Sequence, residues 1–324
     1  MVSLPSGRRG QLLIIGSILL AVAIVGLSVV ANSVLFTESV ARSVSNAQLS
    51  DVDEFSVETQ DGIRELTHRV NHAERNRTTA ELKADLRRNA RNYSRLLAES
   101  YATSGPVAVN VSAGPDDSEF GHRIVQAADG NLTDDGSPGA EDWDLVATTD
   151  RQTLGWFALN VEVFETATDR GRIVVGNGSA DVDLRINRTG SGGAANLTLE
   201  ADPSWSAPTT LECNPSKGRV LLDLAAGEAV ARECTGDGTF PGADRLGGDV
   251  SIEIENGDRI QGQYDVVVAG DPSPGGYTDC SAAVAPDQPC RTPAVWTANA
   301  SLSFVGSRAA FGNDYDLEVY GESS

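Results

Sequence analysis

The residues of this chain with the clearest chemical potential are its four cysteines. They all lie beyond residue 212 and are separated by 21, 46 and 10 residues. The four are Cys213, Cys234, Cys280 and Cys290. A zinc site made of four cysteines needs close pairs of the C-x-x-C kind, so this spacing favours two disulfide bonds. Four cysteines allow three pairings, and we expect nearest neighbours to pair, 213 with 234 and 280 with 290, because shorter closures are the default.

Two of the three histidines have a spacing that could bind a metal. His68 and His72 are four residues apart, which places both imidazoles on one face of a helix. The residues between them include no Glu of the metalloprotease kind, and no further His or Cys is near in the sequence. We interpret the pair as part of a solvated helix face. We therefore expect no metal and no cofactor.

Motifs for nucleophilic or nucleotide chemistry are missing from the sequence. There is no G-x-S-x-G, no P-loop and no dinucleotide G-x-G-x-x-G, and His122 has no recognisable Ser or Cys partner motif. Carboxylates are too numerous for any two to be singled out as an acid and a base. The sequence therefore predicts a protein that is not an enzyme.

Half of the sixteen asparagines begin an Asn-x-Ser/Thr motif, the acceptor for N-glycosylation. The eight are Asn76, Asn92, Asn110, Asn131, Asn177, Asn187, Asn196 and Asn299. At the Ser and Thr content of this chain, chance would give only about two or three. We read the excess as glycosylation on exposed loops and strand ends.

The charge of the chain excludes a large class of partners. The 324 residues carry 46 Asp and Glu against 25 Lys and Arg, a formal net charge of -21. Such a surface repels the phosphate backbone, so nucleic acid is not an expected partner. Only two of the cations are lysines. A surface so rich in acids and poor in lysine resembles that of proteins from extreme halophiles.

The first residues form a basic leader followed by a long apolar segment. Residues 1–10 contain Arg8 and Arg9, and the 25 residues from Leu12 to Phe36 carry no charge. As a helix they would measure about 37 Å, against roughly 30 Å of bilayer hydrocarbon. The sequence predicts a transmembrane helix over residues 11–36, with the N-terminus in the cytoplasm and the bulk of the chain extracellular. The expected localisation is the cell membrane, as a single-pass protein.

Three fates of this segment remain open. It could be a secretory signal peptide cut after the small residues Val29 and Ala31, or an uncleaved signal anchor. The third follows from Arg8-Arg9-Gly10-Gln11, which resembles the leader of archaeal type IV pilins and archaellins. The resemblance implies that a prepilin peptidase cuts after Gly10, that Gln11 becomes the mature N-terminus, and that the apolar helix packs with other pilin-like subunits.

Residues 37–104 predict a helical stalk. Apolar residues recur there at helical spacing, and Thr78 with Glu81 forms a capping box at the start of a second run. The polar residues 74–79 predict a turn between two antiparallel helices. Gly105-Pro106 ends the second helix.

Residues 105–324 predict a β-rich extracellular domain. Eleven short runs of Val, Ile, Leu, Thr and aromatic residues alternate there with Gly, Asp, Asn and Ser clusters. Antiparallel sheets packed as a sandwich would account for them. The expected fold class is therefore α+β, with a transmembrane helix, a helical stalk and an antiparallel β-sandwich-like domain.

These features together predict a non-enzymatic cell-surface protein. The resemblance at Gly10 and Gln11 favours a pilin-like accessory or structural subunit of a type IV pilus-like system, with an adhesive or structural role. Its partners would be the membrane, a prepilin peptidase and other pilin-like subunits. The alternative is an uncleaved single-pass envelope protein that binds a solute or a partner protein through its β-domain.

Overall fold

The computed structural model describes residues 47–103, 108–136, 139–162, 170–189, 196–215, 218–230, 234–272, 277–306 and 310–320. The chain divides into two compact units, Met1–Val57 and Glu58–Ser324. Only residues 47–57 of the first unit are described, so the architecture that can be followed is that of the second unit.

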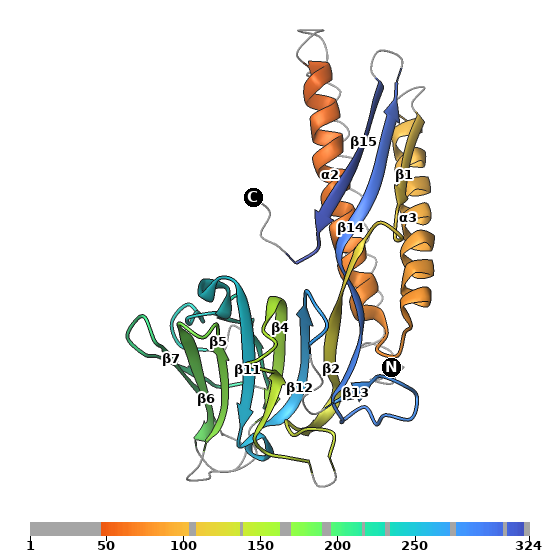
Figure 1. Ribbon diagram of the computed structural model, residues 1–324. Coiled ribbons are helices and arrows are strands. Elements are labelled where there is room, and N and C mark those ends of the chain that lie inside the picture. The colour runs from red at the N-terminus through yellow and green to blue at the C-terminus, as the bar shows by residue number, and fades with distance from the viewer. Residues whose placement is uncertain are drawn as a thin grey trace, which may run out of the picture. The chain divides into compact units, whose positions relative to one another are not determined.

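Two α-helices are followed by fifteen strands in the described part of the chain (Figure 1). The helices are α2 (Ala47–Ala73), which belongs to the second unit from Glu58 on, and α3 (Thr79–Ala102). The strands are β1 (Ala108–Ala113), β2 (Glu119–Asn131), β3 (Trp143–Val146), β4 (Gln152–Glu162), β5 (Gly171–Gly176), β6 (Asp181–Thr189), β7 (Asn196–Pro203), β8 (Thr209–Cys213), β9 (Val220–Asp223), β10 (Glu228–Ala229), β11 (Asp249–Glu255), β12 (Gln261–Val268), β13 (Thr278–Asp279), β14 (Cys290–Val305) and β15 (Ala310–Glu318). Short 3-10 turns lie at Ala243–Leu246 and Gly257–Arg259.

Almost all strand pairs run antiparallel. The main path of hydrogen-bonded neighbours is β1-β14-β2-β12-β4-β11-β5-β6-β7-β8. Strand β9 pairs with β4 and β10, β3 with β11, and β15 with β14, while the short β13 pairs with β14 in parallel. Strands β5 to β8 are sequential neighbours, whereas β2, β4, β12 and β14 meet from distant parts of the sequence.

Strand β14 takes part in two regions of this sheet. Its residues 290–297 pair with β2, and its residues 297–305 pair with β15 on one side and, from Ala300 on, with β1 on the other. We call the second region the β1–β14–β15 sheet. Helix α3 packs along β1 (Figure 1). One continuous strand therefore links the helix-covered region to the larger sheet.

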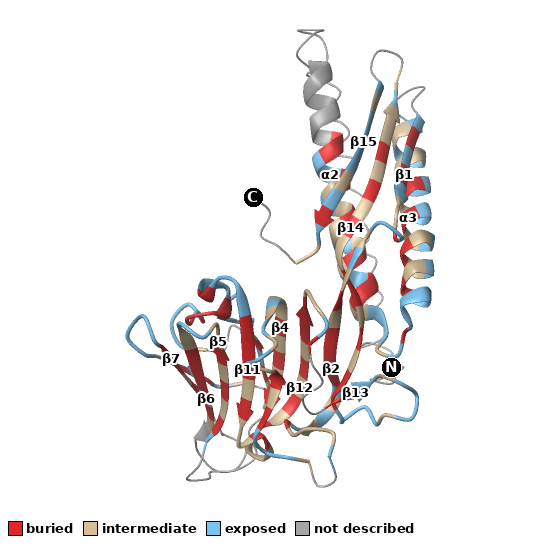
Figure 2. Cartoon of the chain, viewed as in Figure 1, coloured by how far each residue is buried: buried red, intermediate tan, exposed pale blue. Residues whose placement is uncertain are grey.

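The larger sheet contains the main hydrophobic core. Alternate residues are buried, as Ile173 and Val175 are in β5 and Leu197, Leu199 and Ala201 are in β7. This alternation is typical of an antiparallel sheet with one covered face, and each fully buried Leu or Ile stabilises the fold by roughly 1.5–3 kcal/mol. Figure 2 shows buried residues recurring along these strands, with exposed residues concentrated in the loops.

Helix α3 buries a single ridge and is positioned by specific contacts at both flanks. The buried residues of the ridge recur every four positions, and they are Leu82, Leu86, Ala90 and Ser94. The Ser94 hydroxyl accepts a hydrogen bond of 2.9 Å from the backbone N–H of Val111 in β1. A Cβ at Gly62 of α2 would lie 2.1 Å from the Tyr93 hydroxyl oxygen, so glycine permits the close approach of α2 and α3.

The turn between α2 and α3 is confirmed, as is the capping box. The Glu81 N–H donates to the Thr78 hydroxyl, and the Glu81 carboxylate accepts from the Thr78 N–H at 2.9 Å. Arg77 lies buried inside the turn, where it donates to Asp85 at 2.9 Å and to the carbonyl of Val70. These contacts satisfy backbone groups that a helix end leaves unpaired.

Both disulfide bonds join nearest-neighbour cysteines, Cys213 with Cys234 and Cys280 with Cys290. The first ties the end of β8 to a distant loop, and the second closes residues 281–289 at the start of β14. The closed loops span 21 and 10 residues, and constraining the unfolded chain in this way contributes on the order of 3 kcal/mol each.

The predicted fold class is wrong. The described residues form mainly antiparallel β-sheet with two helices, and neither of these helices is long and apolar enough to cross a membrane. The expected single-pass localisation in the cell membrane is contradicted by the same finding. The predicted span, residues 11–36, and the leader, residues 1–10, lie outside the described residues. The transmembrane helix in that prediction relied on the hydropathy of residues 11–36, which does not by itself fix a fold class.

Candidate functional site

A group of interacting polar side chains in the second unit lies where α2 meets the sheet. We call it the α2–sheet cluster, and its members are Asn71, His72, Arg123, Asp265 and Tyr320. Four of them come from α2, β2 and β12, and Tyr320 lies two residues beyond the end of β15. Sequence separations of up to 249 residues mean that only the fold brings them together.

The centre of the cluster is the carboxylate of Asp265. In the β2–β12 pair Asp265 lies opposite Val125, so Arg123 is its diagonal neighbour on the same face. Arg123 donates to both oxygens of Asp265, from Nε and Nη2, at 2.8 Å each. His72 reaches the same carboxylate through Nδ1 at 2.7 Å. The side chains of Arg123, His72 and Asp265 are 8%, 18% and 20% exposed, so these charged contacts are poorly screened by water.

Asn71 connects α2 directly to the backbone of β14. Its amide oxygen accepts from the N–H of Val295 at 2.9 Å, and its amide nitrogen donates to the carbonyl of the same residue at 2.8 Å. The same nitrogen also donates to the Tyr320 hydroxyl at 2.9 Å. Asn71 thus satisfies both backbone groups of Val295, and helix and strand are held in one register.

Tyr320 and His72 connect Asn71 to Asp265 through a series of hydrogen bonds. The Tyr320 hydroxyl lies 3.2 Å from Nε2 of His72, on the side of the imidazole opposite Asp265. A neutral His72 with its proton on Nδ1 donates to Asp265 and accepts from Tyr320. Each donor in this series of hydrogen bonds then faces an acceptor.

Aromatic rings cover the cluster. His68 lies 4.4 Å from His72 between ring centroids, and 5.3 and 5.5 Å from the rings of Trp156 and Tyr320. Trp296 contacts Tyr320 in turn, at 5.7 Å. Ring pairs at these distances stabilise the packing and exclude water from the polar groups beneath.

The environment of the cluster shifts several pKa values. Burial alone would raise the pKa of Asp265, but the hydrogen bonds from His72 and Arg123 outweigh it and hold that pKa below its ordinary value. Burial lowers the pKa of His68, and the neighbouring His72 lowers it further. Burial also raises the pKa of the Tyr320 hydroxyl well above its ordinary value. The folded protein therefore favours a charged Asp265, a neutral His68 and a protonated Tyr320.

The order carboxylate, imidazole, hydroxyl in this cluster is that of a nucleophile triad. Tyr320 is nevertheless a poor nucleophile, because its pKa is raised and its oxygen already accepts a hydrogen bond from Asn71. Arg123 further neutralises the Asp265 carboxylate that would have to support a charged imidazole. The arrangement is suited to holding α2 on the sheet.

The interpretation of His68 and His72 as a solvated helix face is wrong. Both rings are partly buried, and His72 faces the sheet instead of water. The sequence reasoning missed this because the partners, Asp265 and Tyr320, are far away in the chain. In the part of the chain that the structure describes, no group of three or more His, Cys, Asp or Glu side chains could hold a metal ion.

The eight sequons differ in accessibility. Asn76, Asn92, Asn110 and Asn131 are exposed, whereas Asn177, Asn187, Asn196 and Asn299 are half-buried. The amide nitrogen of Asn177 donates to the carbonyl of Leu246 at 2.7 Å, and that of Asn299 donates to Asp316 at 2.8 Å. A glycan on either residue would replace one of the two amide hydrogens available for these contacts. Gly10 and Gln11, the predicted processing site, lie outside the described residues.

A family of unknown function, DUF7261, matches residues 6–120, a range that contains both helices and β1 and stops at the start of β2. No curated protein and no solved structure matches the chain. The similarity therefore covers the N-terminal third of the chain, and it does not indicate an activity.

Proposed function

We propose that this chain is a non-enzymatic, pilin-like subunit of a surface filament system, in which it has an accessory or structural role. The observation that carries the proposal is the closed α2–sheet cluster. The groups best able to do chemistry, His72, Asp265 and Tyr320, are all engaged in fixing α2 to the β-domain. A subunit that transmits force between an N-terminal segment and a displayed domain needs such a junction.

The sequence of the N-terminus supports the same role. The step Arg8-Arg9-Gly10-Gln11 precedes an apolar segment, and processing after Gly10 would retain that segment in the mature chain. The apolar segments of neighbouring subunits would then pack together, with their small residues allowing close approach. A prepilin peptidase and other pilin-like subunits are the partners that this role requires.

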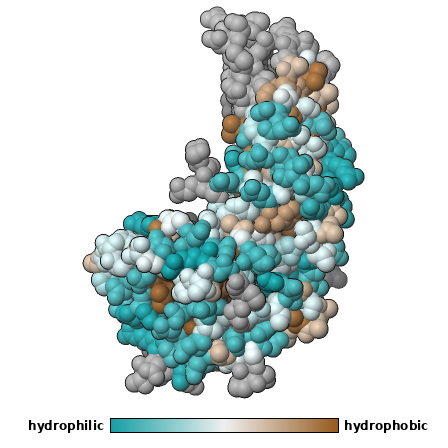
Figure 3. All heavy atoms as spheres, in the orientation of Figure 1, coloured by the Kyte–Doolittle hydropathy of each residue, from teal (hydrophilic) through white to brown (hydrophobic). Residues whose placement is uncertain are grey.

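The surface of the β-domain supports a displayed role. The face in Figure 3 is largely hydrophilic, and the chain as a whole carries a charge of -21. Two disulfide bonds indicate an oxidising environment, as exported proteins experience. Net charge of this size keeps displayed domains from associating non-specifically.

A substitution in the leader tests the proposal. We expect wild-type chain in the filament fraction sheared from cells of the native host, and none of the Gly10→Val variant, because valine blocks cleavage at that bond. Gly7→Val changes another glycine of the same leader and should leave assembly intact.

Two results would count against the proposal. Absence of the wild-type chain from sheared fibres would favour a protein that acts through its β-domain outside any filament. Equal incorporation of the Gly10 variant and the wild type would show that the leader step is not a processing site.

A further inference from the structure

The face of the β1–β14–β15 sheet that carries Asn110 is lined by small polar side chains. Asn110 of β1 lies opposite Ser303 of β14, which in turn lies opposite Gly312 of β15. In the adjacent row, Ser301 donates to Asp314 at 2.5 Å. Directly opposed residues in antiparallel strands point to the same face, so these side chains form one surface.

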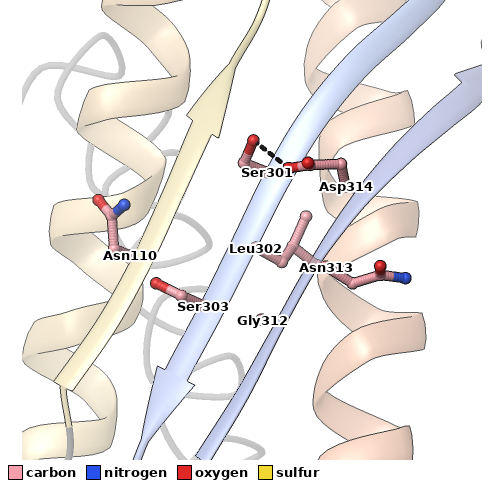
Figure 4. Close-up of a pocket in the computed structure, with 7 residues that line it drawn as sticks. All are labelled: Asn110, Ser301, Leu302, Ser303, Gly312, Asn313 and Asp314. Carbon is pink, nitrogen blue, oxygen red and sulfur yellow. Dashed lines mark hydrogen bonds between the residues drawn. The ribbon is translucent and has the colours of Figure 1, made fainter.

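This surface contains a shallow pocket (Figure 4). Its volume is about 340 Å³, and it is lined by Asn110, Ser301, Leu302, Ser303, Gly312, Asn313 and Asp314. Small-molecule sites begin at about 300 Å³, so the pocket has room for one compact polar group. Gly312 keeps it open, because a side chain at that position would occupy the space that the glycine leaves between its neighbours.

Asn110 stands apart from the other sequons because it borders this pocket. Its side chain is exposed, and in the described part of the chain no hydrogen bond engages its amide. Ser112, which completes the motif Asn110-Val-Ser, lies two residues further on the same face, opposite Ser301. The acceptor amide, the motif hydroxyl and a polar pocket are thus placed side by side.

We propose that Asn110 carries an N-linked glycan and that the first sugar of this glycan is seated in the pocket beside Gly312. The co-reactant is a sugar activated as a phosphate or diphosphate ester, transferred by a separate enzyme. A bond forms between the Asn110 amide nitrogen and the anomeric carbon, and the bond from that carbon to the phosphate oxygen breaks. The amide releases one proton, and the phosphate carrier leaves with the electron pair.

The chemistry of the pocket fits a sugar. The Ser303 hydroxyl can donate and accept hydrogen bonds, and the Asp314 carboxylate accepts them, which matches the hydroxyl groups of a pyranose ring. In the described residues Ser303 makes no side-chain hydrogen bond that a sugar would have to displace. The bare backbone at Gly312 allows the ring to approach the sheet closely. Attachment two strands away supplies the sugar at a high effective concentration, so even weak contacts order it.

The proposal depends on export of the chain and not on its assembly into fibres. A chain that is absent from filaments can still carry the glycan, and an unglycosylated chain can still assemble. The two proposals can therefore fail separately.

Glycopeptide mass spectrometry of protein from the native host tests the attachment. We expect the peptide containing Asn110 to carry a glycan, and both Asn110→Gln and Ser112→Ala to lose it. Asn92→Gln, which removes another exposed sequon on α3, should leave the modification at Asn110 unchanged. An unmodified Asn110 peptide in the wild-type protein would overturn the proposal.

A double-mutant cycle with Gly312→Val tests whether the first sugar binds in the pocket. A Cβ at Gly312 would meet only the carbonyl oxygen of Leu302, at 3.9 Å, so valine fills the pocket without disturbing the strand. In the wild-type background we expect Ser112→Ala to lower Tm by about 2–4 °C, because the protein loses the sugar bound in the pocket. In the Gly312→Val background we expect Ser112→Ala to leave Tm unchanged. Asn92→Gln should change Tm by the same amount in the wild-type and Gly312→Val backgrounds. An equal change in Tm from Ser112→Ala in both backgrounds would show that the sugar does not bind in the pocket beside Gly312.

Discussion

Asp265 is the residue on which the polar contacts between α2 and the sheet converge. It accepts two hydrogen bonds from Arg123 and one from His72, in a site that is four-fifths buried. Replacing its carboxylate by a neutral group removes the counter-charge of Arg123, whose other hydrogen bonds go to the backbone carbonyls of Asn71 and Glu74. The contribution of the α2–sheet cluster to stability can therefore be measured at this one position.

Asp265→Asn should lower the free energy of unfolding by about 3 kcal/mol, because removing one partner of a buried pair leaves an uncompensated charge. Denaturant unfolding of the full chain measures this loss. Glu65→Gln is the matched control on α2, since the Arg69–Glu65 pair is 76% and 74% exposed and contributes less than about 1 kcal/mol. Equal effects of the two substitutions would show that the cluster does not hold the helix.

His68 should make stability depend on pH. An unfolded histidine takes up its proton near pH 6.5, whereas burial and the neighbouring His72 lower the pKa of His68 in the folded state. Protonation therefore favours the unfolded chain, and the free energy of unfolding should fall as the pH drops below about 6.5. The facing charges of Asp265 and Glu65 raise this pKa, and that of Arg123 lowers it.

The variant His68→Gln removes this titration. We expect its unfolding free energy, measured by denaturant titration from about pH 7 to pH 5, to fall less steeply than that of the wild type. Identical slopes for the two proteins would contradict the assignment. The lowered pKa of Asp265 adds a separate loss of stability at lower pH, as that carboxylate becomes protonated.

At the residue scale, the sequence revealed motifs but not partners. The cysteines, the sequons and the spacing of His68 and His72 could be read directly. The ion pair of Arg123 with Asp265 could not, because 142 residues separate them and the register of β2 against β12 alone makes them neighbours. The pocket beside Asn110 depends in the same way on the pairing of three strands.

The start of α3 is the element whose stability is most directly encoded in the local sequence. Thr78→Ala should lower the free energy of unfolding by about 1 kcal/mol, because the Glu81 N–H loses the Thr78 hydroxyl that accepts its hydrogen bond. Thermal unfolding gives the measurement. Thr79→Ala, one position further on, keeps the cap and should change stability by less than about 0.5 kcal/mol. A Thr79 variant as unstable as the Thr78 variant would argue against the cap.

Elements with regular patterns could be predicted, and irregular ones could not. The turn at residues 74–79 lies where the sequence places it, and the run Gln261–Val268, one of the eleven that predict strands, forms β12. Strand β2 was missed, because Gly121, His122, Arg123 and Gln126 interrupt its apolar run. Those polar residues are needed there, since Arg123 pairs with Asp265 and the amide of Gln126 donates to the carbonyl of Gly262 at 3.1 Å.

On the scale of the whole molecule, composition limited the partners more than it defined the fold. The charge of -21 argues against nucleic acid, and the four cysteines pair as nearest neighbours. The fold class was predicted wrongly because hydropathy of the first residues dominated the expectation. In the second unit, helix α2 is held in place by the α2–sheet cluster and by the packing of Ile63 and Val70.

The mature N-terminus of the protein, determined by mass spectrometry on material from the native host, tests the central claim most directly. A pilin-like subunit processed after Gly10 begins at Gln11, and we expect that start. A chain that begins at Met1 or Val2 would contradict prepilin-type processing, and a start near Asn32 would show that the apolar segment is removed and cannot serve in assembly.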